Sequence, residues 1–311
     1  MKIYQNIDDF EGAGYAIVTV GTFDGLHIGH QKIVRRMAEL AVDHNGDTVV
    51  VTFYPHPRLV LEPGNNELKF ITTEQKKYEL LEALAIEHLV ILPFTKAFAA
   101  MKADDFIRDY LVGKLGVKKL VVGYDHHFGN KREGNYDHLF RQGVQYGFGV
   151  EEIAAQYVDD IAVSSTQVRN ALTAGNLRLA NRMLGYDYSI TGKVVEGNRI
   201  GRTMGFPTAN IAVEDKYKLI AAGGVYACRV KIDGRVYHGM GNIGTRPTIA
   251  KHDFATEVHI FNFDGYIYGK TITIYFIDRI RDEKKFESLE GLKNQLVKDK
   301  NTVLQKLDRI V

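Results

Sequence analysis

The sequence predicts two domains of different fold class: a doubly wound α/β domain with a parallel sheet, then a small antiparallel β-barrel that ends in a helix. Three observations lead to this prediction. The chain has 311 residues, about twice the length of a typical domain. In the first half, short β-branched runs alternate with helical patterns, whereas in the second half strands follow one another directly. With 45% hydrophobic and 25% charged residues, the composition is that of an ordinary globular protein.

The first domain is predicted from its alternating periodicity. Its strand candidates are short, apolar and β-branched, as in sheets covered on both faces; they are Tyr15–Val20, Thr48–Phe53, His88–Leu92 and Lys119–Val122. Between them, apolar residues recur at helical spacing within Ile33–Ala41, Tyr78–Ala85 and Phe106–Leu111. Parallel strands joined by right-handed crossovers explain this order. Helices near Ser165–Ala174 and Leu177–Leu184 are expected to close a domain of residues 1–186.

The second domain, residues 187–311, is predicted from consecutive strands separated by Gly and Asp turns. The strand candidates are Ser189–Glu196, Gly224–Ile232, Val236–Gly241, Glu257–Phe263 and Thr271–Ile280. The pair Asp233-Gly234 is a hairpin signal. Only Leu289–Leu307 has a helical pattern, so a small barrel with a terminal helix is expected.

Charge and cysteine content exclude several classes of protein. The net charge of +2 is too near neutral for binding polyanions through bulk charge. Residues 1–186 carry 20 basic and 23 acidic side chains and the remainder 20 and 15, and neither balance indicates a nucleic-acid-binding arm. The single cysteine, Cys228, cannot form an internal disulfide, and its neighbours predict a buried strand thiol.

The N-terminal segment has acidic residues where a secretory signal needs an apolar run, and no stretch approaches the roughly 20 apolar residues that span a bilayer. We therefore expect a cytoplasmic protein without a membrane partner.

The strongest local motif is GTFDGLHIGH at residues 21–30, where the first strand ends and the first long helix begins. Ligands bind at this edge of open α/β sheets, and a helix N-terminus offers free N–H groups to phosphates. Gly21, Gly25 and Gly29 allow close backbone approach, while His27 and His30 add side-chain donors. The motif therefore favours a nucleoside triphosphate.

Two other interpretations of this motif stay open on spacing alone. A strand–glycine–helix turn with two histidines can be ordinary turn chemistry. Zinc is a weaker alternative, because Asp24 is the only other hard ligand nearby. A Walker loop is excluded, since no Gly-Lys-Ser/Thr follows.

The motif resembles the phosphate-binding signature of the HxGH nucleotidyltransferases, specifically the adenylyltransferase module of bacterial bifunctional riboflavin kinase/FMN adenylyltransferases (FAD synthetases). Later motifs match in the same order: TFYPHPR at 52–58, VGYD at 122–125 with Phe128-Gly129, and SSTQVR at 164–169. One departure is His126-His127, where the family more often has an aromatic and a basic residue.

The resemblance implies roles for residues of the first domain. Catalytic groups would be His27, His30 and Arg169. The ATP phosphates would be bound by Gly21, Phe23, Asp24, Gly25, Gly29, Ser164, Ser165 and Thr166. The flavin side of the site would include Pro55, His56, Pro57 and Asp125. From the residues alone, Ser165, Thr166 and Arg169 fit either a phosphate site or a plain helix cap with a surface arginine.

The second domain also matches the family's kinase motifs. TGKVVEG at 191–197 and GRTMGFPTAN at 201–210 form a glycine-rich flap between two strands, and GNIGTRPT at 241–248 and EVHIFNFD at 257–264 follow. The resemblance makes Gly197, Gly201, Arg202 and Gly205 the flap over a polyphosphate. Thr208 and Asn210 would bind Mg²⁺, a cation that prefers oxygen ligands.

Glu257 is the candidate general base, because a carboxylate on an apolar strand can accept the proton of a primary alcohol. Without the resemblance, Glu257 fits a strand-end surface acid, and Thr208 with Asn210 fits an exposed polar strand face.

Together the motifs imply a bifunctional enzyme. Riboflavin and ATP would give FMN and ADP in the barrel, and FMN and ATP would give FAD and pyrophosphate in the α/β domain, both with Mg²⁺. Its partners would be small molecules, with no nucleic acid and a homo-oligomer open. The alternatives are a monofunctional adenylyltransferase with a remnant barrel, and a flavin-sensing or nucleic-acid-binding regulator that uses the barrel.

Overall fold

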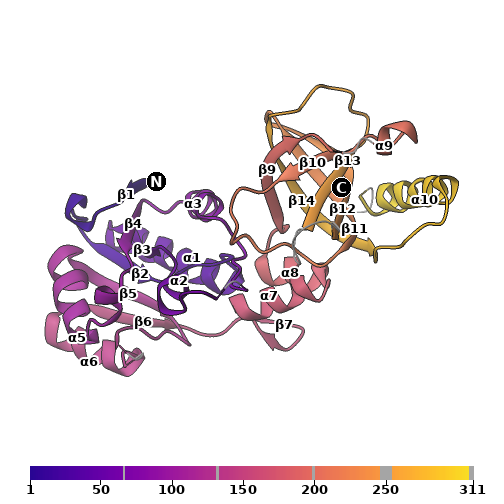
Figure 1. Ribbon diagram of the computed structural model, residues 1–311. Coiled ribbons are helices and arrows are strands. Elements are labelled where there is room, and N and C mark those ends of the chain that lie inside the picture. Colours follow the sequence, from indigo (N-terminus) through magenta and orange to yellow (C-terminus); the bar gives the residue numbers. More distant parts are fainter. Residues whose placement is uncertain (66, 131–132, 198–199, 246–253, 308–311) are drawn as a thin grey trace. The chain divides into compact units, whose positions relative to one another are not determined.

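The computed structural model describes residues 1–65, 67–130, 133–197, 200–245 and 254–307 (Figure 1). The chain folds into two compact units, Met1–Ser165 and Thr166–Val311. The first unit is an α/β layer and the second is a β-barrel with helices. The fold class predicted from the sequence is therefore confirmed.

The first unit is built on a six-stranded sheet in the order β1-β4-β3-β2-β5-β6, and every pair of neighbouring strands is parallel. The strands are β1 (Lys2–Tyr4), β2 (Ala16–Val20), β3 (Asp47–Tyr54), β4 (His88–Pro93), β5 (Val117–Gly123) and β6 (Gly149–Ile153). The sequence pattern predicted the four central strands. It missed β1 and β6, which lie at the two edges of the sheet and are less apolar.

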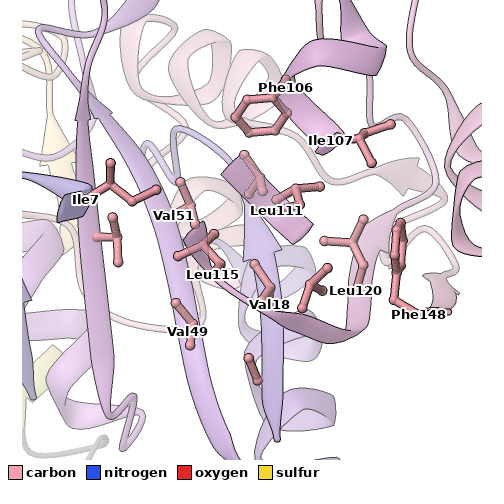
Figure 2. Close-up of a cluster of buried hydrophobic side chains, with 14 of the residues drawn as sticks. Ile7, Val18, Val49, Val51, Phe106, Ile107, Leu111, Leu115, Leu120 and Phe148 are labelled. Carbon is pink, nitrogen blue, oxygen red and sulfur yellow. The ribbon is translucent and has the colours of Figure 1, made fainter. Parts of the chain in front are cut away.

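Alternate residues of the strands pack on opposite faces, which produces two cores. Val18, Val49 and Val51 pack with Leu111 and Leu115 of the segment after residue 105 (Figure 2). On the other face, the intervening residues of the same strands pack against the helices α1 (Ile28–His44) and α3 (Glu74–Ala83). Both faces are thus covered, as the continuous apolar strands require.

The helices of this unit follow the predicted periodicity with one change of type. They are α1 (Ile28–His44), α2 (Pro57–Leu61), α3 (Glu74–Ala83), α4 (Lys96–Ala99), α5 (Ala103–Asp105) and α6 (Tyr136–Tyr146), with the short 3₁₀ turn η1 (Ile7–Asp9). The segment η2 (Phe106–Lys114) is a π-helix. A small β7–β8 pair (Tyr157–Val158, Ile161–Ala162) precedes residue 165.

The second unit contains a closed antiparallel barrel in the order β10-β13-β12-β11-β14-β9, with β9 pairing β10 (Figure 1). Its strands are β9 (Ser189–Val195), β10 (Ala209–Ala212), β11 (Gly224–Ile232), β12 (Arg235–Thr245), β13 (Phe254–Ile260) and β14 (Thr271–Arg281). The hairpin predicted at Asp233-Gly234 is confirmed: both residues have positive φ, 48° and 82°, and connect β11 to β12.

Among the described residues, the helices of the second unit are α7 (Ser165–Thr173), whose first residue ends the first unit, α8 (Leu177–Leu184), α9 (Ile200–Thr203) and α10 (Leu289–Leu307). Helix α8 packs on β14, where Arg178 binds Asp278 at 2.7 Å and Asn181 donates to the carbonyl of Phe276. The sequence analysis placed α7 and α8 with residues 1–186, whereas the division between compact units falls at residue 165. The boundary between functional domains at 186 stays a prediction.

Candidate active sites

The loop between β2 and α1 combines unusual backbone conformations with two stacked histidines. Phe23 and Gly25 have positive φ, 51° and 80°, so the chain turns sharply before His27 begins α1. The rings of His27 and His30 stack with their centres 3.8 Å apart. A Cβ on Gly29 would lie 3.2 Å from the His27 ring, so the absence of a side chain at residue 29 leaves space for the stacked rings. The motif therefore forms a preorganised corner at the carboxyl end of β2.

His30 lies in the wall of a cavity of about 690 Å³ in the first unit. Burial, and secondarily the charge of His27, lower the pKa of His30 well below its ordinary value, so its ring is neutral at pH 7. Among the described residues, the buried Nδ1 of His30 has no hydrogen-bond partner. Gly21 and Phe23 line the same cavity, which brings three of the predicted site residues together.

Asp24 does not line this cavity; its buried carboxylate holds the loop to the segment before α3. Its Oδ1 accepts hydrogen bonds from the amides of Ile71 (2.9 Å) and Thr72 (3.1 Å). The amide of Gly25 in turn donates to the Thr72 hydroxyl. The structure therefore gives Asp24 an anchoring contact, and its predicted role at the phosphates stays a prediction.

The motif at residues 164–169 is divided between the two units. Ser165, the last residue of the first unit, donates from Oγ to the carbonyl of Asp24 at 2.8 Å. Ser164 also lies in the first unit. Thr166 and Arg169 belong to the second unit, so their predicted roles depend on the motif alone.

Of the residues predicted on the flavin side, Pro57 and Asp125 line the cavity, while Pro55 and His56 do not. The ring of His56 accepts a hydrogen bond from the Arg58 amide and stacks on Phe70. His56 therefore caps α2, which is a local structural role.

An aromatic lining was missed in the sequence analysis. The side chains that line the cavity include Phe53, Phe94, Phe98, Phe106 and Phe128. They come from separate elements, and only the fold brings them together. Phe94 and Phe98 follow β4. Apolar residues just after the carboxyl end of a strand were the signal in the sequence that could have indicated this lining.

His126 and His127, which depart from the family pattern, also line this cavity. Burial, and secondarily the charge of His127, lower the pKa of His126 to about 4. The ring of His126 stacks against Phe128 with a centre-to-centre distance of 5.7 Å. The imidazole of His126 thus stands in the wall as a neutral flat ring at pH 7.

In the barrel, the residues predicted for phosphoryl transfer lie together. The Thr208 hydroxyl donates to Oε2 of Glu257 at 3.2 Å. Asn210 on β10 and Asn242 on β12 are both register partners of Glu257 on β13. A Cβ on Gly197 would lie 2.1 Å from the amide nitrogen of Asn210, so the start of the flap lies against that side chain.

Two cavities meet at Thr208, which lines both. The larger, about 350 Å³, has charged side chains in its wall, among them Glu257, Arg281, Glu283 and Lys284. Most of its surface is apolar, and the apolar lining includes Met204, Phe206, Met240, Phe286, Leu292 and Leu296. The smaller, about 210 Å³, contains Arg202 and the segment 263–268. Glu257 therefore lines the larger cavity, and its hydrogen-bond partner Thr208 lines both.

The predicted flap residues lie around these cavities. Gly201 lines the larger cavity and Arg202 the smaller. Gly205 has a φ of 83° in the turn after α9. Buried His259 was missed in the sequence analysis; its Nδ1 lies 2.8 Å from the carbonyl of Pro207 and so fixes the segment that carries Thr208. Within the motif at 241–248, Arg246, Pro247 and Thr248 lie outside the described residues.

Within the described part of the chain, no group of three or more histidine, cysteine, aspartate or glutamate residues could hold a metal ion. A cation at Thr208 and Asn210 would therefore take further oxygen ligands from water or a bound phosphate. The helices in the described ranges include none long and apolar enough to cross a membrane.

Comparison with known proteins matches each unit to a family. Residues 11–167 match the FAD synthetase family, and residues 184–307 match the riboflavin kinase family. A relative from Buchnera aphidicola (strain APS), described as a bifunctional riboflavin kinase/FMN adenylyltransferase, is 37% identical over 96% of both chains. The chain belongs to this family of bifunctional proteins. The resemblance that the motifs indicated is thereby confirmed.

Other members of the bifunctional riboflavin kinase/FMN adenylyltransferase family are equally similar. The relative from Haemophilus influenzae is 38% identical over 92% of both chains, and that from Pseudomonas fluorescens is 39% identical over 91% of this chain and 90% of its own. A crystal structure of a protein from Streptococcus pneumoniae, described as a macrolide-efflux protein, has 32% identity and a TM-score of 0.90 over 97% of this chain and 98% of its own. The FAD synthetase match contains the 690 Å³ cavity, and the riboflavin kinase match contains the cavities at Thr208.

Proposed function

We propose that the first unit transfers the adenylyl group of ATP to FMN in the cavity at His30, and that the barrel phosphorylates riboflavin at Glu257. The observation that supports this assignment most directly is the presence of separate constellations in the two units. One is a loop at a helix N-terminus, and the other is a carboxylate beside a hydroxyl and an amide. These suit adenylyl transfer and phosphoryl transfer, respectively.

In the first unit, positioning and charge stabilisation would supply the catalysis. The FMN phosphate attacks the α-phosphorus of ATP, and the bond to the departing pyrophosphate breaks. His27 and His30 offer ring N–H donors, of which that of His30 is neutral, and the N-terminus of α1 adds the helix dipole. Arg169 and the hydroxyls of Ser164, Ser165 and Thr166 are assigned to the phosphates on their motif alone. The aromatic cavity suits the flavin ring, because flat rings pack against one another.

In the barrel, Glu257 accepts the proton of the riboflavin 5′-hydroxyl as that oxygen attacks the γ-phosphorus of ATP. The apolar 350 Å³ cavity suits the flavin, and the smaller cavity beside Arg202 suits the nucleotide. ADP leaves, and FMN becomes the substrate of the first unit.

The donor set fits Mg²⁺ in the barrel. Thr208 contributes a hydroxyl and Asn210 an amide oxygen, and both lie next to the Glu257 carboxylate. Mg²⁺ commonly takes such oxygens together with water and substrate phosphates. When bound, it would neutralise charge on the transferring phosphoryl group. The partners are thus small molecules, and the cytoplasm, where ATP is made, is the proposed location.

The decisive experiment follows both reactions in one tube. The purified chain is incubated with riboflavin, ATP and Mg²⁺, and flavins and nucleotides are separated by chromatography. We expect FMN to form first with one ADP per FMN, and FAD to follow with one pyrophosphate per FAD. Accumulation of FMN without FAD, even with FMN supplied directly, would contradict the assignment of the first unit. Failure to convert riboflavin would contradict that of the barrel.

A further inference from the structure

A buried lysine lies beneath the loop between β2 and α1. Lys77 on α3 is only 3% exposed, although lysine is almost never fully buried unless its charge is paired. Burying an ammonium group without partners costs several kcal/mol, in the order of magnitude known for buried ions. The position of Lys77 therefore demands specific acceptors.

Three acceptors surround the Lys77 ammonium, which matches its three N–H groups. The carboxylate of Glu74, one turn earlier on α3, lies 3.0 Å away. The Thr52 hydroxyl on β3 lies at 3.3 Å, and the carbonyl of Thr22 in the loop lies at 3.5 Å. One side chain thus connects α3, the central sheet and the loop.

Glu74 is itself held in place. Its carboxylate accepts a hydrogen bond from the Tyr78 hydroxyl at 3.1 Å. Burial, and secondarily the Glu74 charge, raise the pKa of Tyr78, so this hydroxyl remains a donor. The Glu74 carboxylate therefore has a fixed orientation, and it fixes the position of the Lys77 ammonium in turn.

The same part of the chain fixes the loop at a second point. Asp24 accepts from the amides of Ile71 and Thr72, just before α3 begins. A side chain would not fit at residue 25: its Cβ would lie 2.8 Å from the Ile71 side chain, and the φ of 80° favours glycine. The loop is thus held through Thr22 on one side of Phe23 and through Asp24 on the other.

We propose that Lys77 is a positioning residue for adenylyl transfer: it fixes the Thr22 carbonyl and, with the Asp24 contacts, sets the conformation of the loop that binds the triphosphate. The inference rests on the proposed function of the first unit. Lys77 is not among the residues that line the 690 Å³ cavity, whereas Thr22 and Phe23 are. Lys77 therefore acts on the substrate through the loop. Because the peptide bond is planar and trans, fixing the Thr22 carbonyl also fixes the direction of the Phe23 N–H.

The chain offers a matched control on the same helix. Lys76 also pairs with a glutamate three residues away, Glu79, at 3.1 Å, but its side chain is 20% exposed. Glu79 belongs to α3, so this ion pair lies within one helix. Lys77→Met removes the connection between α3, the sheet and the loop, and Lys76→Met removes an ion pair within α3.

The experiment compares FMN-to-FAD conversion by wild type, Lys77→Met and Lys76→Met, with riboflavin phosphorylation by the same samples as an internal measure of intact protein. We expect Lys77→Met to lower kcat for FAD formation by about 10- to 100-fold, the scale for small misplacements of a reacting group. Kinase activity and the Lys76→Met variant should stay within about twofold of wild type, since surface ion pairs contribute little. A Lys77→Met rate within about threefold of wild type would overturn the proposal.

A double variant separates positioning from stability. Lys77→Met leaves the Glu74 carboxylate without its cation, so a lower melting temperature is expected. Glu74→Gln/Lys77→Met removes both charges and should restore much of that temperature while FAD formation stays low. Recovery of FAD formation in step with the melting temperature would show a purely structural role and refute the inference. Wild type that makes FMN but no FAD would instead refute the proposed function.

Discussion

The hydroxyl of Thr208 lies 3.2 Å from Oε2 of Glu257, at the point where the two barrel cavities meet. Thr208 precedes β10 and Glu257 lies on β13, so strand pairing fixes this contact. The carboxylate is thus held at the end of the apolar cavity, and the hydroxyl reaches the neighbouring one. The proposed base for the alcohol and a proposed oxygen ligand of the cation are thereby placed side by side.

Glu257→Gln should abolish riboflavin phosphorylation, because the amide cannot accept the proton of the alcohol. Loss of a general base costs about 10²- to 10⁴-fold in rate. The amide still accepts the Thr208 hydrogen bond, so the fold should persist. Both activities are measured by chromatography of flavin products. Equal loss of FMN and FAD formation, with FMN supplied for the second reaction, would argue against separate sites.

Gly197→Ala should weaken the kinase through Asn210, the proposed metal ligand. The new Cβ would lie 2.1 Å from the amide nitrogen of Asn210, so that side chain must move. We expect a higher Mg²⁺ concentration for half-maximal phosphorylation, by at least about tenfold, the factor that one lost ligand contact of 1.4 kcal/mol represents. Gly14→Ala is the control, since nothing lies within 4 Å of its Cβ position. An unchanged Mg²⁺ requirement in Gly197→Ala would remove Asn210 from the site.

The fold was largely predictable because its periodicities are local. Strands such as Thr48–Phe53 are apolar on both faces, and the turn at Asp233-Gly234 specifies its hairpin through two positive φ angles. The edge strands β1 and β6 carry weaker patterns, since an edge strand needs less apolar surface. The π-helix at Phe106 shows no signal distinct from an ordinary helix.

The candidate sites were predictable where the polar residues lie on one segment or in motifs of the family. His27 and His30 share a helix start, and Thr208 was linked to Glu257 through family motifs. The aromatic cavity wall and the contact of Lys77 with the loop depend on residues far apart in the chain. Asp24 shows another limit: nothing in its motif indicated that Oδ1 of its carboxylate accepts hydrogen bonds from the amides of Ile71 and Thr72, and its role at the phosphates stays a prediction.

Acid should destabilise the first unit partly through His30. Because burial and His27 lower its pKa in the folded state, the unfolded chain binds a proton more readily. Folding stability is therefore retained above the ordinary histidine pKa and is lost as the pH falls toward the folded-state value. The contribution is at most about 1.4 kcal/mol per pH unit for one proton.

Melting curves from pH 8 to pH 5 should show a shallower decline for His30→Gln than for wild type. Parallel curves would show that His30 titrates normally. The kinase rate of His30→Gln at pH 7.5 should match wild type.

Asp299→Asn should loosen α10 from the barrel and weaken riboflavin binding. Buried Asp299 accepts three hydrogen bonds from Arg281, the shortest at 2.7 Å, and one from Gln295. Arg281 lines the larger cavity, so its release would disturb the wall of that cavity as well as the helix. Breaking a buried ion pair costs about 3 kcal/mol or more. We expect a lower unfolding midpoint in urea and a raised KM for riboflavin, with the KM for FMN in FAD formation unchanged.

The matched control is Asp282→Asn, which breaks the exposed pair between Arg279 and Asp282 and should change stability by less than about 1 kcal/mol. If both variants unfolded at the same urea concentration, the Asp299 pair would have no special part in holding the helix.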